Sequence, residues 1–228
     1  MPRACSLTRI TIVEDHELFA EALDLALTLE GHEVRRVTIR EHVGPDGNLA
    51  EAILNSRPQV VLLDLDLGSA SGTPVVQPLT AVGIAVVVVT GDTDRARWGE
   101  VLSYGARTVL PKSAPLNAIL ATVRMIEEGR RILPREERDR LLGAYSAQRR
   151  ETLDTRTRLE SLSTREAEIL EHLTNGKHVS EIARESFVSE ATVRTQVKSV
   201  LAKLGVSSQL AAVSMGLKAR GRARAQHE

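Results

Sequence analysis

The chain has 228 residues, enough for one large or two modest domains, and 42% of them are apolar. Aromatic residues make up only 2%, so a core has to be built from Ala, Val, Leu and Ile, which suits parallel strands covered by helices better than a β-sandwich. The single cysteine, Cys5, excludes a disulfide or a Cys-based metal site within one chain and fits a reducing compartment. No apolar run approaches the roughly 20 residues that span a bilayer, and the N-terminus lacks the apolar stretch of a signal peptide. We therefore expect a cytoplasmic protein with no membrane partner.

The formal net charge is zero, but the charges are unevenly distributed. From Arg156 to the end, 12 Lys and Arg residues stand against 8 Asp and Glu residues, a net charge of +4, which leaves −4 on the rest of the chain. An acidic front part and a basic rear part predict different partners for the two.

Short β-branched runs alternate with helical patterns through roughly the first 130 residues. We expect strands at residues 9–13, 33–38, 59–63, 84–89 and 107–110, and helices at residues 16–30, 48–55, 93–104 and 114–128. The first helix is expected to bury one face, consisting of Leu18, Phe19, Ala22, Leu23, Ala26 and Leu29. Five strands that alternate with helices predict an α/β domain with a doubly wound, five-stranded parallel sheet.

The rest of the chain is predicted to be a linker followed by several helices. Residues 134–158 are dense in Arg and Glu, which favours a partly helical linker. Helices are expected at 165–174, 179–185 and from Ser189 to Leu204. We divide the chain into an α/β domain at 1–130, a linker at 131–157 and a small all-α domain at 158–228 that ends in a basic tail.

Polar residues stand where four of the predicted strands end: Glu14 and Asp15, then Asp64, Thr90 and Lys112. Doubly wound sheets bind ligands at the carboxyl ends of their strands, so these side chains should converge. Three carboxylates repel one another unless a cation lies among them, and Mg²⁺ favours oxygen ligands. A carboxylate beside Mg²⁺ can attack a phosphoryl group and form an aspartyl phosphate, while the metal and Lys112 neutralise the transferring oxygens. Each residue alone is more often a turn or surface residue; the combination, in this order, favours a phosphoacceptor site.

These residues give the segment 8–130 a resemblance to the receiver domains of response regulators. The resemblance implies a phosphoacceptor at Asp64, a switch hydroxyl at Thr90 and a phosphate-binding lysine at Lys112. It also implies a Mg²⁺ site in which Asp15 and Asp64 bind the ion, Glu14 acts mainly through water, and Asp66 offers its backbone carbonyl.

The sequence departs from the receiver pattern in two places. Val109 stands three residues before Lys112, where the family often has Tyr or Phe, so the usual coupling between that aromatic ring and the switch threonine cannot operate. The segment 68–72 lacks the usual proline, and the helix that follows, with Pro74 and Pro78, looks short.

The rear domain carries the signals of a helix-turn-helix. Ser163 and Glu166 form a capping-box pattern, and Ser189 caps a later helix. One face of that later helix presents Thr192, Arg194, Thr195, Lys198 and Lys203. Arg and Lys can bond guanine and Thr can contact a thymine methyl in the major groove, although one such face alone is as easily a solvated surface.

The segment from Leu159 to Leu217 resembles LuxR-type DNA-binding domains. The resemblance rests on Leu162-Ser-Thr-Arg-Glu166, Gly176, Glu181-Ile-Ala183, Val188-Ser189, Thr192-Val-Arg194 and Lys203-Leu-Gly-Val206. It implies that Arg194, Thr195 and Lys198 face the bases and that Thr192 and Lys203 contact phosphates. Gln196 stands where His is frequent and Gln209 where Arg is common.

Together the two resemblances point to a NarL/FixJ-type response regulator rather than an enzyme. They imply DNA, a cognate sensor histidine kinase and RNA polymerase as partners, and a homodimer on paired half-sites, because one small domain contacts few phosphates. Two alternatives stay open. The Asp64-x-Asp66 spacing is similar to that of haloacid-dehalogenase-type phosphatases, and Val109 would suit an atypical receiver that is controlled without phosphorylation.

Overall fold

The computed structural model describes residues 7–38, 48–68 and 70–225, and Cys5 lies outside them. The chain divides into two compact units, Met1–Ser146 and Ala147–Glu228. In the described part of the chain, no single helix is long and apolar enough to cross a membrane; one pair of helices bent by 63° meets that test only when the two are taken together.

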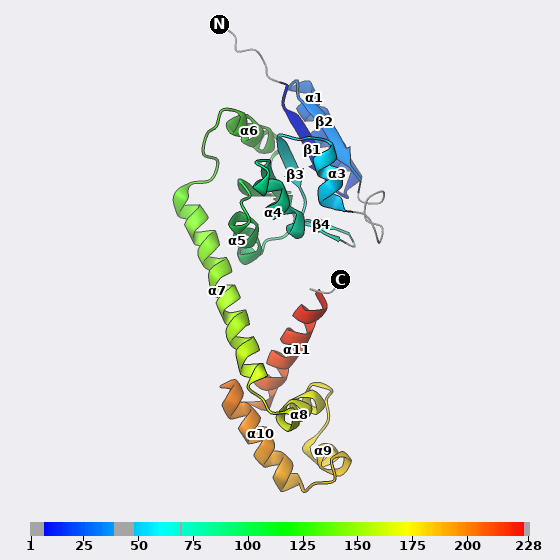
Figure 1. The fold of residues 1–228 in the computed structure, drawn as a ribbon, viewed down its shortest axis with the longest axis vertical. Coiled ribbons are helices and arrows are strands. Elements are labelled where there is room, and N and C mark those ends of the chain that lie inside the picture. Colours follow the sequence, from blue (N-terminus) through cyan, green and yellow to red (C-terminus); the bar gives the residue numbers. More distant parts are fainter. Residues whose placement is uncertain (1–6, 39–47, 69, 226–228) are drawn as a thin grey trace. The chain divides into compact units, whose positions relative to one another are not determined.

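The first unit is a parallel sheet with helices on both faces, as the alternating pattern predicts (Figure 1). The strand order is β2-β1-β3-β6-β7. The strands are β1 (Arg9–Val13), β2 (Glu33–Val37), β3 (Val60–Leu63), β6 (Ala85–Thr90) and β7 (Thr108–Pro111). The helices are α1 (Glu17–Leu29), α3 (Leu49–Asn55), α4 (Thr73–Ala81), α5 (Arg95–Ser103) and α6 (Leu116–Glu127). A short antiparallel pair, β4 (Asp66–Leu67) and β5 (Ala70–Ser71), was not expected from the sequence.

Two apolar clusters, one on each face of the sheet, form the core of this unit. One joins α1 and α6 to the strands through residues such as Leu23, Leu27 and Ile119. The other joins α3, α4 and α5 to the opposite face through residues such as Ile53 and Leu79. Because successive strand residues point to opposite faces, the continuous apolar runs of β3 and β6 supply both clusters.

The predicted buried face of α1 is confirmed at Leu23 and in part at Phe19, which packs against the core, but it is wrong at both ends of the helix. The helix buries Ala20, Leu23 and Leu27, whereas Leu18 is 83% exposed and Leu29 is 79% exposed. Apolar residues surround most of this helix, so its periodicity fits more than one stripe, and the position of the helix over the sheet decides which stripe is buried.

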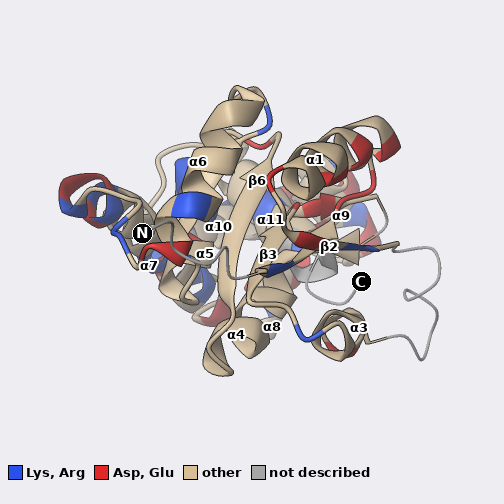
Figure 2. Cartoon of the chain, turned by 90° about the horizontal axis from the view of Figure 1, so that it is seen from above, with Lys and Arg blue, Asp and Glu red and all other residues tan. Residues whose placement is uncertain are grey.

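The predicted linker is a single 26-residue helix, α7 (Arg135–Glu160). Figure 2 shows that it carries charges of both signs, the composition from which a linker was expected. Its first turns belong to the first unit, where Leu141 is buried in the apolar cluster that includes α5. Gly99 of α5 makes this packing possible, because a Cβ there would lie 2.0 Å from the Leu141 carbonyl oxygen.

The second unit is all helical, as predicted: α8 (Thr164–Thr174), α9 (Val179–Glu185), α10 (Glu190–Leu204) and α11 (Gln209–Ala225). The predicted capping box at Ser163 and Glu166 is present, and Ser189 caps α10 by accepting a hydrogen bond from the Thr192 backbone amide. The face of α10 opposite its polar residues is buried at Val193, Val197, Val200 and Leu204. Most of the basic tail continues as the last turns of α11.

Candidate functional site

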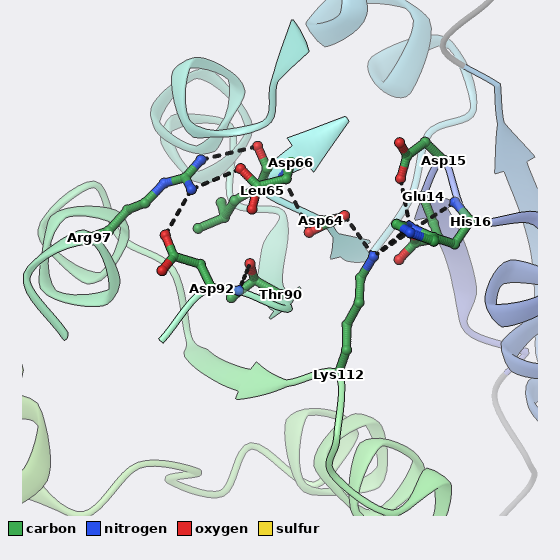
Figure 3. A network of polar contacts seen from close by, with 10 residues as sticks. All are labelled: Glu14, Asp15, His16, Asp64, Leu65, Asp66, Thr90, Asp92, Arg97 and Lys112. Atoms are coloured by element: carbon green, nitrogen blue, oxygen red, sulfur yellow. Dashed lines mark hydrogen bonds and ion pairs between the residues drawn. The ribbon is translucent and has the colours of Figure 1, made fainter. Parts of the chain in front are cut away.

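The polar residues at the strand ends meet in one pocket, shown in Figure 3. Parallel pairing aligns the ends of β1, β3 and β6, which brings Glu14, Asp64 and Thr90 to the same edge of the sheet. Asp64 is 2% exposed and Thr90 is fully buried. Lys112 follows β7 and reaches across, so that its ammonium lies 2.7 Å from Glu14 Oε1 and 2.7 Å from Asp64 Oδ2.

Lys112 is therefore the cation that holds the two most buried carboxylates together. Burial alone would lower the pKa of its ammonium, but the hydrogen bonds to Asp64 and Glu14 outweigh burial, and the pKa is raised above its ordinary value. The lysine stays charged at every physiological pH and can serve as a fixed positive group for an anion that enters the pocket.

Four side chains offer metal-ligand atoms that all lie within 4.8 Å of one another: Glu14, Asp15, His16 and Asp64. Three of them are predicted site residues. His16 was expected only as the start of a helix, yet its Nδ1 lies 2.9 Å from Asp15 Oδ1 and 3.0 Å from Glu14 Oε1. Only its place directly after Glu14 and Asp15 could have indicated from the sequence that His16 lies in the pocket.

Gly72 explains how the loop after Asp64 keeps its shape. A Cβ at this position would lie 2.1 Å from the Asp64 carbonyl oxygen, and the Gly72 amide donates a hydrogen bond to the Leu65 carbonyl at 2.9 Å. A glycine is thus required where the chain turns back past the Asp64 backbone and enters α4.

The Asp66 side chain lies outside the pocket, where it meets a residue that the sequence analysis missed. Asp66 Oδ1 is 2.8 Å from the Arg97 guanidinium, which also contacts Asp92 Oδ2 at 2.8 Å. The same guanidinium donates a hydrogen bond to the Leu65 carbonyl at 3.3 Å. Figure 3 shows this Arg97 cluster beside the pocket, on the opposite side of Asp64 from Glu14 and Asp15.

Val109 occupies the position where receiver domains often have Tyr or Phe. It is buried in the apolar cluster shared by α3, α4 and α5. Its methyl groups cannot form a hydrogen bond or swing between a buried and an exposed position as a tyrosine can.

In the second unit, the predicted DNA-facing residues of α10 have different surroundings. Arg194 is 71% exposed and pairs with Glu190 at 3.0 Å, and the Thr195 hydroxyl donates to the Ala191 carbonyl. Lys198 is exposed and has no hydrogen-bond or ion-pair partner among the described residues. The Thr192 hydroxyl lies 2.9 Å from the hydroxyl of Ser189.

Lys203, like Arg194, is a predicted contact whose charge is already paired. Its ammonium lies 2.6 Å from Glu166 Oε2, and Glu166 also accepts hydrogen bonds from the Ser199 hydroxyl and the Ser163 amide. Lys203 first, then Ser199 and Ser163, lower the pKa of Glu166 from 4.5 to about 2. The ion pair joins the start of α8 to the end of α10, so Lys203 has to share its charge with Glu166 or release it in order to contact a phosphate.

Comparisons with known proteins agree with both units. The family model of the response regulator receiver domain matches residues 10–124, and that of the bacterial regulatory proteins of the luxR family matches residues 160–216. The transcriptional regulatory protein DesR of Bacillus subtilis is 24% identical over 90% of this chain and 94% of its own length. The probable transcriptional regulatory protein NarL of Mycobacterium tuberculosis is 27% identical over 93% of this chain and 94% of its own length. Among solved structures, RcsB of Salmonella enterica bound to the promoter rprA aligns over 91% of this chain and 97% of its own, with 20% identity and a TM-score of 0.44.

A receiver domain followed by a helix-turn-helix domain defines a class of DNA-binding transcription regulators rather than of classical enzymes. The chain belongs to the response regulators of two-component systems, with a receiver domain and a LuxR-type DNA-binding domain.

Proposed function

We propose that phosphorylation of Asp64 controls sequence-specific DNA binding, and through it transcription. The proposal rests on one observation: the Lys112 ammonium lies 2.7 Å from the buried Asp64 carboxylate. A cation at this distance can neutralise the negative charge of a phosphoryl group on Asp64. Thr90 lies at the end of the neighbouring strand, fully buried, with its hydroxyl oxygen accepting the Asp92 amide at 3.1 Å.

In the proposed reaction, one Asp64 carboxylate oxygen attacks the phosphorus of a phosphodonor. The new oxygen–phosphorus bond forms as the bond to the donor breaks: the phosphohistidine of a sensor kinase leaves as histidine, and acetyl phosphate leaves as acetate. Lys112 neutralises charge on the transferring oxygens, and the Thr90 hydroxyl donates to one of them after transfer.

The donor set of the pocket fits Mg²⁺. Glu14, Asp15 and Asp64 supply carboxylate oxygens within 4.8 Å of one another, and hard divalent ions prefer such ligands. We propose that Asp15 and Asp64 bind the ion directly, with the Asp66 backbone carbonyl as a further ligand and Glu14 acting mainly through water. A bound Mg²⁺ supplies charge neutralisation for the incoming phosphoryl group.

For the second unit, we propose that α10 enters the major groove. Arg194, Thr195 and Lys198 would face the bases, with Thr192 and Lys203 at the phosphates. The support is the exposure of Arg194 and Lys198 on the capped half of a helix whose other face is buried. RcsB, a structural relative, is described in complex with promoter DNA.

The remaining partners follow from the class of protein. A cognate sensor histidine kinase would supply the phosphoryl group, a homodimer would occupy paired half-sites, and RNA polymerase would respond to the bound dimer in the cytoplasm. One domain of this size makes few phosphate contacts, so pairing on DNA multiplies its affinity.

The test is phosphoryl transfer from acetyl phosphate in the presence of Mg²⁺, with the full chain and two variants. We expect the wild type to carry an acid-labile phosphoryl label that base or hydroxylamine also removes, as for an acyl phosphate. The label should be absent in Asp64→Asn and present in Asp66→Asn. Labelling that survives loss of Asp64 would refute the assignment. A requirement for the Asp66 side chain would favour the phosphatase alternative. Absence of label in the wild type would favour an atypical receiver controlled without phosphorylation, the alternative that Val109 suits.

A further inference from the structure

A response regulator needs a route by which the pocket changes the rest of the domain, and the buried Val109 offers no rotating aromatic ring for it. The Arg97 cluster is the part of the molecule best placed to supply that route. Arg97 is 26% exposed, and its guanidinium holds both loops that border the pocket, the one after Asp64 and the one after Thr90.

On the Asp64 side, the guanidinium binds the two residues that follow the phosphoacceptor. It accepts no hydrogen bonds and donates to the Leu65 carbonyl and the Asp66 carboxylate. The Asp66 amide in turn donates to Asp64 Oδ1 at 3.2 Å. Asp66 thus connects the Asp64 carboxylate to Arg97, so a shift of that carboxylate can reach the guanidinium through a single residue.

On the Thr90 side, Asp92 is the contact point. Its amide donates to the Thr90 hydroxyl oxygen, its carbonyl accepts from Trp98 Nε1 at 3.0 Å, and its carboxylate binds Arg97. The pKa of Asp92 is lowered, chiefly by a hydrogen bond from the Asp94 amide and then by Arg97, so the pair stays ionised. Asp92 therefore links the switch hydroxyl to two neighbouring residues of α5.

The next residues of α5 face α7. Gly99 lies against the Leu141 backbone, and the Leu102 carbonyl accepts a hydrogen bond from Arg138 at 3.1 Å. A single short helix therefore joins the pocket loops, through Arg97 and Trp98, to the first turns of α7.

We propose that Arg97 is the positioning residue that couples phosphorylation of Asp64 to α5 and α7, in place of the aromatic residue absent at Val109. When the Thr90 hydroxyl turns to donate to a phosphoryl oxygen, Asp92 loses that contact while Arg97 still ties it to Leu65 and Asp66. The two loops then move together, and α5 moves with them. An arginine suits this role because its planar guanidinium serves several acceptors at once.

The proposal rests on the proposed phosphorylation, and its test separates the two. The full chain, Arg97→Gln and the control Arg95→Gln are treated with acetyl phosphate and Mg²⁺, or with beryllofluoride and Mg²⁺. Arg95 is a matched control because it lies on the same helix but pairs with Glu137 of α7 rather than with the pocket loops. Trp98 is the only tryptophan, so its fluorescence reports on the Asp92 contact, and hydrogen exchange of residues 135–146 reports on α7.

We expect Arg97→Gln to accept the phosphoryl group on Asp64 but to lose the Trp98 fluorescence change, which Arg95→Gln retains, and to lose the exchange change in α7 as well. If Gln at 97 disturbs folding, Arg97→Lys replaces it; that variant keeps the charge and should lose most of the response, because an ammonium cannot hold the same acceptors in one plane. A wild-type response in labelled Arg97→Gln or Arg97→Lys would overturn the proposal. Absence of label in the wild type would overturn the proposed function and the coupling with it.

Discussion

Substitution of Gly99 by alanine sets two effects against each other, and the structure decides between them. Alanine favours a helix interior by about 1 kcal/mol over glycine. The new Cβ, however, would lie 2.0 Å from the Leu141 carbonyl oxygen, so α7 has to move away by more than an ångström. Leu141 is 2% exposed, and burial of a leucine contributes about 1.5–3 kcal/mol. The docking of α7 should therefore weaken by about 0.5–2 kcal/mol.

Hydrogen exchange of residues 135–146 measures this docking directly, and we expect it to accelerate about 2- to 30-fold in Gly99→Ala. Gly143 of α7 provides the control, because nothing lies within 4 Å of a Cβ built there. Gly143→Ala should slow exchange about fivefold, because alanine stabilises the helix relative to glycine and its Cβ meets no neighbouring atom here. If Gly99→Ala slowed exchange as Gly143→Ala does, close packing of α7 on α5 would be refuted.

Three further predictions concern the DNA-binding unit. The pKa of Glu166 is lowered to about 2, so its ion pair with Lys203 should stabilise this unit above pH 4.5 and lose that effect as the pH falls toward 2. Glu166→Gln should therefore flatten the pH dependence of the free energy of unfolding between these two values. An unchanged pH profile in the variant would contradict the pairing with Lys203. Ser189→Ala removes the cap of α10 and should cost about 1 kcal/mol in urea unfolding of this unit, whereas no loss would mean that the cap is dispensable. Lys198→Ala should weaken DNA binding and lower the slope of log affinity against log salt by about one if Lys198 contacts a phosphate, and leave the slope nearly unchanged if it reads a base.

Much of the first unit could be predicted because its signals are local. The apolar runs of β3 and β6 identify buried parallel strands, and the polar residues after them mark the pocket edge. The buried face of α1 could be predicted only in part: Leu23 was expected, but apolar residues surround the helix, and only its place over the sheet selects Ala20 and Leu27. The packing of α7 was hidden by its charged composition, because α7 has one fully buried leucine, Leu141, and the space for it depends on Gly99 of another helix.

The site was predictable in its carboxylates and lysine, which stand directly at strand ends, but not in the residues that connect them. Arg97 lies 31 positions after Asp66 in an ordinary amphipathic helix, and only the folded loops bring the two together. The engagement of Lys203 by Glu166 was missed for the same reason, since it joins two helices of the second unit. Pairings of this kind depend on tertiary geometry that no local pattern records.

In the proposed function, the phosphorylation state of Asp64 sets the affinity for DNA. The most direct measurement compares binding of the full chain to fragments selected from a random-sequence DNA library, with and without acetyl phosphate and Mg²⁺, for the wild type and Asp64→Asn. Phosphorylation should change the affinity of the wild type and leave that of Asp64→Asn unaltered. Equal affinities for phosphorylated and unphosphorylated wild type would contradict it.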